Sequence, residues 1–249
     1  MMRGQSEVMT SLFIMTSLIA AFILAFSFTN ANVNINTKEI AVETGRSSIE
    51  SIASILRTGT FSSYFRFSVY FRDGALMFGG TPYSVTVIVA SKAASSTVSS
   101  TLFSATLSAP VIYYSRIEAQ PPTFSAVLAN VVNGPVEPLS DEAVAVFNIN
   151  ETWGVVILPV AFNQTAGTST ASIVLRLPDS SLGGSLGWGY AELYRNYKSN
   201  VTFTLNFPSK TTGYVLVTVS SGLQNWSKNV TFSATSLSVK IGVDKWSNP

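Results

Sequence analysis

The feature that most constrains this sequence is an uncharged apolar segment, Val8–Phe28, close to the N-terminus. The segment contains no charged residue and no proline, and it is rich in Leu, Ile, Phe, Met and Ala. A helix of that length spans roughly 30 Å, which matches the thickness of the hydrocarbon core of a bilayer. We therefore expect an N-terminal helix that enters a membrane or packs among other apolar helices.

Composition limits the chemistry of the rest of the chain. The 249 residues include no Cys and no His, and charged residues make up 11 % of them, against about 25 % in typical soluble proteins. These absences exclude a Ser-His-Asp triad, a disulfide framework and an ordinary zinc site. A net charge of +2 provides no basic surface for nucleic acid. We expect no enzymatic activity, no metal and no other cofactor, and we expect the acidic pair Asp141-Glu142 to be solvated.

The low number of carboxylates also suits a protein that is exposed to acidic surroundings, because fewer side chains need to stay ionised for the protein to be stable. Together with the absence of disulfides, it is typical of surface proteins from acid- or heat-loving archaea.

The segment after the apolar stretch is expected to be helical up to residue 57. Ser47-Ser-Ile-Glu50 has the spacing of a capping box and predicts that a second, amphipathic helix begins there. The alternative is one long helix over residues 8–57 that is interrupted near the asparagines between residues 29 and 37. Thr58-Gly59-Thr60 is expected to end the helix in either case.

From Phe61 onward the apolar period changes to two, which predicts strands. The expected strands are Tyr64–Phe71, Tyr83–Ala90, Val98–Leu107, Val111–Ile117, Thr123–Val132, Ala143–Ile149, Val155–Phe162, Ala171–Leu177, Val201–Phe207, Gly213–Val219 and Val230–Val243. We predict a mainly β fold in which a transmembrane or filament-core helix precedes an antiparallel β-sandwich. The sandwich region, residues 58–249, is expected to be extracellular and to form one module, or two modules divided near residue 120.

Five N-glycosylation sequons lie in the second half of the chain. Their acceptor residues are Asn150, Asn163, Asn200, Asn225 and Asn229. A Ser/Thr-rich chain produces some such triplets by chance, but all five lie far from the apolar segment. This placement predicts N-linked glycans on the distal surface.

Two further patterns have an ordinary structural interpretation. Gly183-Gly-Ser-Leu-Gly187 matches the nucleophile elbow of hydrolases, but Ser185 has no histidine to activate it, so a glycine loop is expected. Tyr113, Tyr114, Tyr190, Tyr194 and Tyr197 are candidates for an exposed strip that binds carbohydrate or a neighbouring subunit. The alternative, which the alternation favours, is that these tyrosines fill the core.

Arg3-Gly4-Gln5-Ser6-Glu7, followed directly by the apolar helix, resembles the class III signal sequence of archaeal type IV pilin-like proteins. The resemblance implies that a prepilin peptidase removes residues 1–4 by cutting between Gly4 and Gln5. Residues 5–57 then remain on the mature subunit, in the membrane before assembly and in a homo-oligomeric filament afterwards. The residues expected to pack between helices are Glu7, Phe13, Leu18, Phe22 and Leu24.

The resulting functional prediction is a filament subunit that displays a glycosylated β-domain for adhesion at the cell surface. Two alternatives remain open from the sequence. One is a monomeric membrane-anchored surface or pilus-accessory protein. The other is a donor-strand pilus subunit formed after signal cleavage near Ala31, in which Val33 and Ile35 alternate along an extended segment.

Overall fold

A computed structural model describes residues 3–59, 63–71, 74–93, 96–115, 122–132, 139–164 and 169–249. The chain divides into two compact units, Met1–Thr44 and Gly45–Pro249, which are described separately. The expected module boundary near residue 120 falls outside the described residues, and the chain on both sides of it belongs to the second unit.

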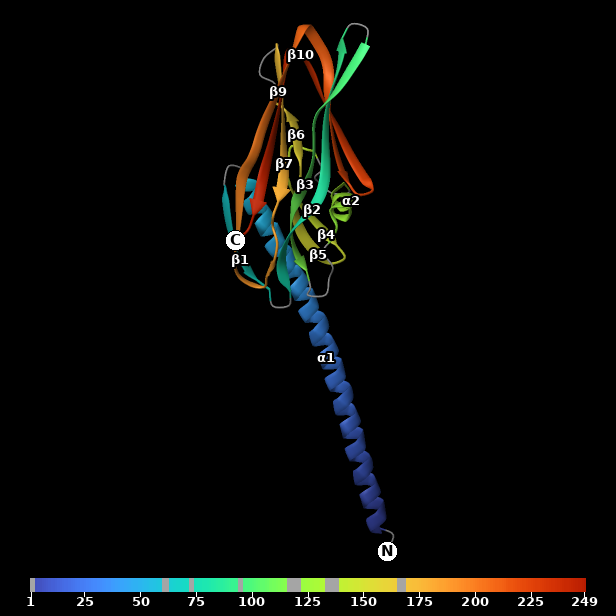
Figure 1. Cartoon of the computed structure of the whole chain (residues 1–249). Coiled ribbons are helices and arrows are strands. Elements are labelled where there is room, and N and C mark those ends of the chain that lie inside the picture. Colours follow the sequence, from blue (N-terminus) through green and yellow to red (C-terminus); the bar gives the residue numbers. More distant parts are fainter. Residues whose placement is uncertain are drawn as a thin grey trace. The chain divides into compact units, whose positions relative to one another are not determined.

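One helix, α1 (Arg3–Thr58), replaces the two helices expected at the N-terminus (Figure 1). The prediction that a helix begins at Ser47 is wrong. The alternative of one long helix is correct in its extent, but the interruption expected near the asparagines is absent, because α1 is continuous there. No proline interrupts the sequence, and threonine hydroxyls bond back to helix carbonyls, as Thr37 Oγ1 does to the Val33 oxygen at 2.6 Å. The helix ends at Gly59, whose N–H donates to the carbonyl of Ile55 at 2.9 Å.

Among the described residues of the second unit, ten strands form one sheet (Figure 1). They are β1 (Tyr64–Tyr70), β2 (Ala75–Ala93), β3 (Ser96–Ser115), β4 (Val144–Ile149), β5 (Thr152–Ile157), β6 (Val160–Asn163), β7 (Thr170–Ser180), β8 (Ser185–Leu186), β9 (Trp188–Ser221) and β10 (Gln224–Ser247). The strand order is β4-β5-β3-β2-β9-β10-β7-β6, with β1 on β9 and β8 on β2. The prediction of a mainly β fold with an N-terminal helix is confirmed.

The sheet is mixed, which corrects the expectation of a purely antiparallel arrangement. β10 pairs antiparallel with β9 but parallel with β7. The cause is the long β9–β10 hairpin, which inserts β10 between β9 and β7. β9 and β10 are the two longest strands of the sheet, and their pairing register shifts between Ala234 and Ser236 and again between Val243 and Asp244.

Two apolar cores result from the alternation of buried and exposed residues along the strands. The larger core takes its side chains from β2, β3, β7, β9 and β10, among others, and includes Val87, Ile173, Val217 and Val239. The second core lies between β1, β9 and the end of α1, and it is described below with the site. The period of two seen in the sequence therefore reflects strands with one face buried.

One predicted strand is a helix. Thr123–Val132 forms α2 (Phe124–Val132), although its composition is rich in Val. Phe124, Val127, Leu128 and Val131 are all buried, and their spacing is helical. Thr123 caps the helix, because its hydroxyl accepts from the N–H of Ala126 at 3.3 Å. The spacing and the cap outweigh the β-propensity of the valines.

Candidate functional site

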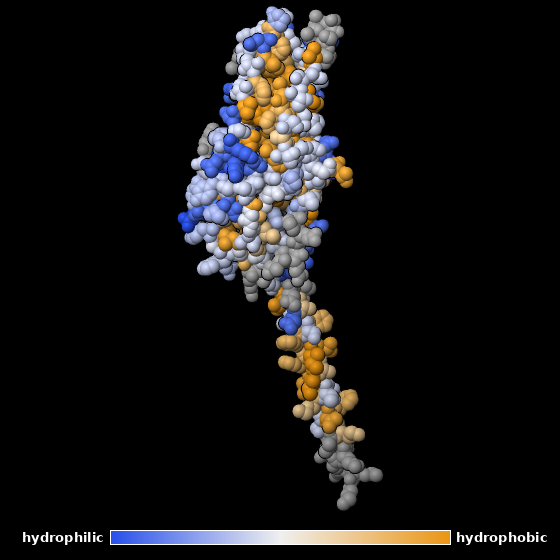
Figure 2. All heavy atoms as spheres, in the orientation of Figure 1, coloured by the Kyte–Doolittle hydropathy of each residue, from blue (hydrophilic) through white to orange (hydrophobic). Residues whose placement is uncertain are grey.

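The first candidate surface is the N-terminal span of α1. Met9–Ala31 is long and apolar enough to cross a membrane, with a mean hydropathy of 2.2, and none of it is buried within the structure. Figure 2 shows apolar side chains along it. Phe13, Leu18, Phe22 and Leu24 are 73, 65, 71 and 62 % exposed. At about 100° per residue these four positions lie on more than one face, so the span is apolar around its circumference.

Two threonine hydroxyls within this span have partners inside the helix. Thr16 Oγ1 donates to the carbonyl of Leu12 at 2.9 Å, and Thr29 Oγ1 donates to that of Ala25 at 2.8 Å. These bonds reduce the penalty of placing a hydroxyl in an apolar medium.

The expected processing site lies at the start of α1. Gly4, Gln5 and Glu7 belong to the helix, but their side chains fall outside the described residues, so the predicted cleavage and the predicted role of Glu7 are not tested. Val33 and Ile35, which the donor-strand alternative requires in an extended segment, lie within α1.

The second candidate surface is the set of sequon asparagines, all of which are exposed: Asn150, Asn163, Asn200, Asn225 and Asn229. Asn150 occupies the turn between β4 and β5 with a φ of 48°, a left-handed conformation that asparagine tolerates better than most residues. Asn163 ends β6, and the other three lie in β9 and β10. Their exposure is compatible with glycan attachment, which stays a prediction.

The five tyrosines divide between the exposed strip and the favoured core interpretation. Tyr113 and Tyr114 are 5 and 1 % exposed and belong to the cores. Tyr190, Tyr194 and Tyr197 are exposed. The difference follows from their strands. Tyr113 and Tyr114 lie in β3, where neighbouring side chains cover them, whereas the exposed tyrosines lie in the first part of β9, which has one open face.

The third candidate surface is a group of aromatic side chains that β1 and β9 bring together, here called the aromatic face. It consists of Tyr64, Tyr70, Trp188, Tyr190 and Tyr194, which are 42, 66, 77, 64 and 36 % exposed. The antiparallel register pairs Tyr64 with Tyr194, Arg66 with Glu192, Ser68 with Tyr190 and Tyr70 with Trp188. All eight residues therefore share one side of the two-stranded ladder.

The opposite side of the same ladder is buried in the second core. Phe65, Phe67 and Val69 of β1 alternate with the exposed residues, and they pack in a cluster that includes Ile52 and Leu56 of α1. This packing fixes which side of β1 faces outward, because a shift of one residue would exchange the two sides.

A charged pair occupies the middle of the aromatic face. Arg66 Nε lies 3.7 Å from Glu192 Oε1, and the Arg66 guanidinium lies over the ring of Tyr190, 4.2 Å from its centroid. The Glu192 carboxylate also accepts from the hydroxyls of Tyr64 at 3.0 Å and Tyr194 at 3.2 Å. Loss of hydration and the neighbouring carboxylate raise the pKa of both tyrosines above the ordinary value. Both therefore remain hydroxyl donors at neutral pH.

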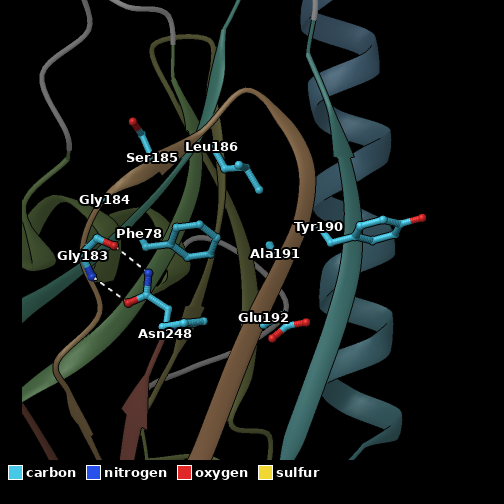
Figure 3. A pocket seen from close by; sticks show the side chains of 10 residues that line it. Phe78, Gly183, Gly184, Ser185, Leu186, Tyr190, Ala191, Glu192 and Asn248 are labelled. Atoms are coloured by element: carbon cyan, nitrogen blue, oxygen red, sulfur yellow. Dashed lines mark hydrogen bonds between the residues drawn. The ribbon is translucent and has the colours of Figure 1, made fainter.

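A shallow depression of about 320 Å³ adjoins the aromatic face (Figure 3). Its lining includes Tyr190, Glu192, Ser185 and the Gly183-Gly184 pair. Asn248 closes one side, with its side chain accepting from the Gly183 N–H at 3.1 Å and donating to the Gly183 oxygen at 2.7 Å. In Figure 3 the Ser185 side chain points away from Glu192, so this carboxylate is not placed to activate it. The expected glycine loop is only partly correct, because Ser185 and Leu186 form the short strand β8 on β2.

The acidic residues of the described chain form no metal-binding group. Asp141 and Glu142 are exposed, and the described part of the chain contains no group of three or more Asp or Glu residues placed to hold a metal ion. No protein-family model, curated protein or solved structure matches the chain.

Proposed function

We propose that this protein is the structural subunit of an archaeal cell-surface filament of the type IV pilus kind. The observation that carries the proposal is the fully exposed, circumferentially apolar span Met9–Ala31. Such a surface is stable in lipid or in a bundle of like helices. The subunit would meet lipid before assembly and the helix bundle of a filament core after it.

The rest of the chain is consistent with a role that depends on surfaces. The domain after Gly45 has its own apolar cores, and its sequon asparagines face solvent. A prepilin peptidase would cut after Gly4, the subunit would wait in the membrane, and identical helices would then bury one another. Glycans on the outer domain would add solubility and resistance to proteases, and the domain would provide the adhesive surface.

The test begins with cells that are sheared to release surface appendages. The sheared fraction is examined for polymers by electron microscopy, and the N-terminal peptide of the protein is identified by mass spectrometry. We expect polymers whose subunits start at Gln5. A start near Asn32 would indicate signal-peptide cleavage, and an intact Met1 confined to membranes would leave a monomeric anchor.

Two variants sharpen this test. Gly4→Val is expected to block processing and to keep the protein in the membrane fraction. Gly183→Ala is a matched control, because a side chain there meets no atom within 4 Å and the residue lies far along the chain from the cut. If the two variants are processed and assembled equally well, the prepilin interpretation is wrong.

A further inference from the structure

We propose that the aromatic face of β1 and β9 is a binding platform for a neutral polysaccharide. This inference concerns a ligand of the folded domain, and it is independent of whether the N-terminal helix assembles into a filament.

The first argument is the placement of the rings. Tyr70 and Trp188 are directly opposite each other, and Tyr190 follows on the same side of β9. Opposite residues in a ladder lie about 5 Å apart and alternate residues about 7 Å apart, so the three rings form a continuous patch. Their exposed fractions, 66, 77 and 64 %, show that most of the surface of these three side chains faces solvent, although the Arg66 guanidinium lies over the ring of Tyr190. Tyr64 and Tyr194 extend the patch, with ring centroids 5.3 Å apart.

The second argument is the kind of apolar group present. Each large apolar side chain on this face is Tyr or Trp, and no Leu, Ile, Val or Phe occupies any of the eight outward positions. Tyrosine and tryptophan combine a flat apolar face with a hydrogen-bonding group at the edge. A sugar ring has the same dual character, since its C–H groups can lie on an aromatic face while its hydroxyls project sideways.

The third argument is the charged pair in the middle of the patch. Arg66 and Glu192 neutralise each other, so the face does not select for an ionic ligand. A protein partner that excluded water would have to desolvate this pair, which is costly unless new hydrogen bonds replace those to water. Sugar hydroxyls can donate to the carboxylate and accept from the guanidinium. These observations favour a hydroxyl-rich ligand over a second protein surface.

The adjoining depression supplies groups that would fix the orientation of such a ligand. Glu192 and Tyr190 line both the depression and the aromatic face. Gly183 and Gly184 have open space where a side chain would stand, so no side chain narrows the depression at this rim. The backbone of Gly183 already bonds to Asn248, and the Gly184 oxygen accepts from the N–H of Phe78 at 3.0 Å. A few polar groups next to an apolar surface are the usual arrangement for orienting a small ligand.

The test uses the full chain in micelles of a detergent without a sugar headgroup. Particles of cellulose, chitin and starch are used to pull down the protein, and the corresponding soluble hexaoses are then titrated against its tryptophan fluorescence. We expect retention on at least one polymer and a blue shift of emission with its hexaose, because stacking shields the exposed Trp188 from water. We expect Trp188→Ala to weaken binding by about tenfold or more, and Trp188→Phe to preserve most of it.

A matched control is available on the same strand. Tyr214 is 38 % exposed in β9 but lies opposite Thr231 and Ala90, away from β1. Tyr214→Ala is expected to bind like the unmodified protein.

Three results would overturn the proposal. These are no retention on any of the three polymers, equal losses for Trp188→Ala and Tyr214→Ala, or a change in oligomeric state with Trp188→Ala, which would identify a protein contact. Filament assembly is scored separately by shearing, so failure of sugar binding is distinguishable from failure of the proposed function.

Discussion

Gly45→Ala should fail to stabilise the protein, although Gly45 lies in a helix. Glycine in a helix interior is about 1 kcal/mol less favourable than alanine, so Gly45→Ala would ordinarily stabilise the protein. Here a Cβ atom would lie 2.6 Å from Cδ1 and 2.8 Å from Cε1 of Tyr114. The ring of Tyr114 has little room to move, because a Cβ built on Gly74 would also lie 2.3 Å from it and the tilted ring of Phe71 packs against it, with the two centroids 4.7 Å apart.

The magnitude follows from these distances. Ordinary carbon contacts begin near 3.4 Å, so the ring or the helix must move by about 1 Å, and overpacking of this kind costs about 1–3 kcal/mol. Subtracting the helix-propensity gain leaves a net destabilisation of about 0–2 kcal/mol for Gly45→Ala. In a Tyr114→Ala background the clash disappears, and the same substitution should stabilise by about 1 kcal/mol. The coupling energy between the two sites is therefore about 1–3 kcal/mol.

The assay is denaturant unfolding of the full chain in micelles, followed by tryptophan fluorescence, for the two single variants and the double variant. Gly79→Ala is the control, since a Cβ there meets nothing within 4 Å and its effect should be the same in both backgrounds. Additive effects of Gly45→Ala and Tyr114→Ala would refute the reasoning, and so would a clear stabilisation by Gly45→Ala alone.

Three other substitutions test separate features of the domain. Gly213→Ala should destabilise strongly, by about 3 kcal/mol or more, because its Cβ would lie 2.4 Å from the backbone oxygen of Ala90; a melting temperature near that of the unmodified protein would contradict this. Tyr83→Phe should lower unfolding free energy by about 1–2 kcal/mol, since the buried hydroxyl donates to the Pro178 oxygen at 2.7 Å; an unchanged denaturation midpoint would contradict it. Burial raises the pKa of Asp244, and Arg176 only partly offsets this, so the folded state holds the proton more tightly than the unfolded state. The contribution of Asp244 to stability is therefore fully present below its unfolded pKa and is lost as pH rises through its folded pKa, by at most about 1.4 kcal/mol per pH unit. Asp244→Asn should therefore reduce the fall in melting temperature that accompanies rising pH between pH 3 and 7. The same pH dependence in the variant and the unmodified protein would contradict a raised pKa of Asp244.

Much of the fold could be predicted from the sequence because most strands have one buried face. β1, with its strict alternation of exposed and buried residues, nearly coincides with the predicted strand Tyr64–Phe71. α2 shows where composition misled the prediction, since Phe124, Val127, Leu128 and Val131 have helical spacing in a segment whose valines favoured a strand.

The aromatic face could not be assembled from sequence alone. Tyr64 and Glu192 are 128 residues apart, and the sequence around each gives no indication of their partner. Tyr70 and Trp188 likewise meet only through the register of β1 on β9, which the packing of Phe65, Phe67 and Val69 determines. Non-local pairing of this kind depends on the whole core, so local patterns identify the strands but not their neighbours.

The last turns of α1 have a mechanical consequence for the domain. Ile49, Ile52, Ala53 and Leu56 are almost fully buried, and the Arg57 guanidinium donates to the Val144 carbonyl. Tension applied at Gly45 therefore loads a helix segment whose buried side chains belong to the second core of the domain. Sliding that helix by one turn, about 5.4 Å, would require all four buried side chains to leave their sites together. The domain should consequently resist pulling from its N-terminal side as a single cooperative unit.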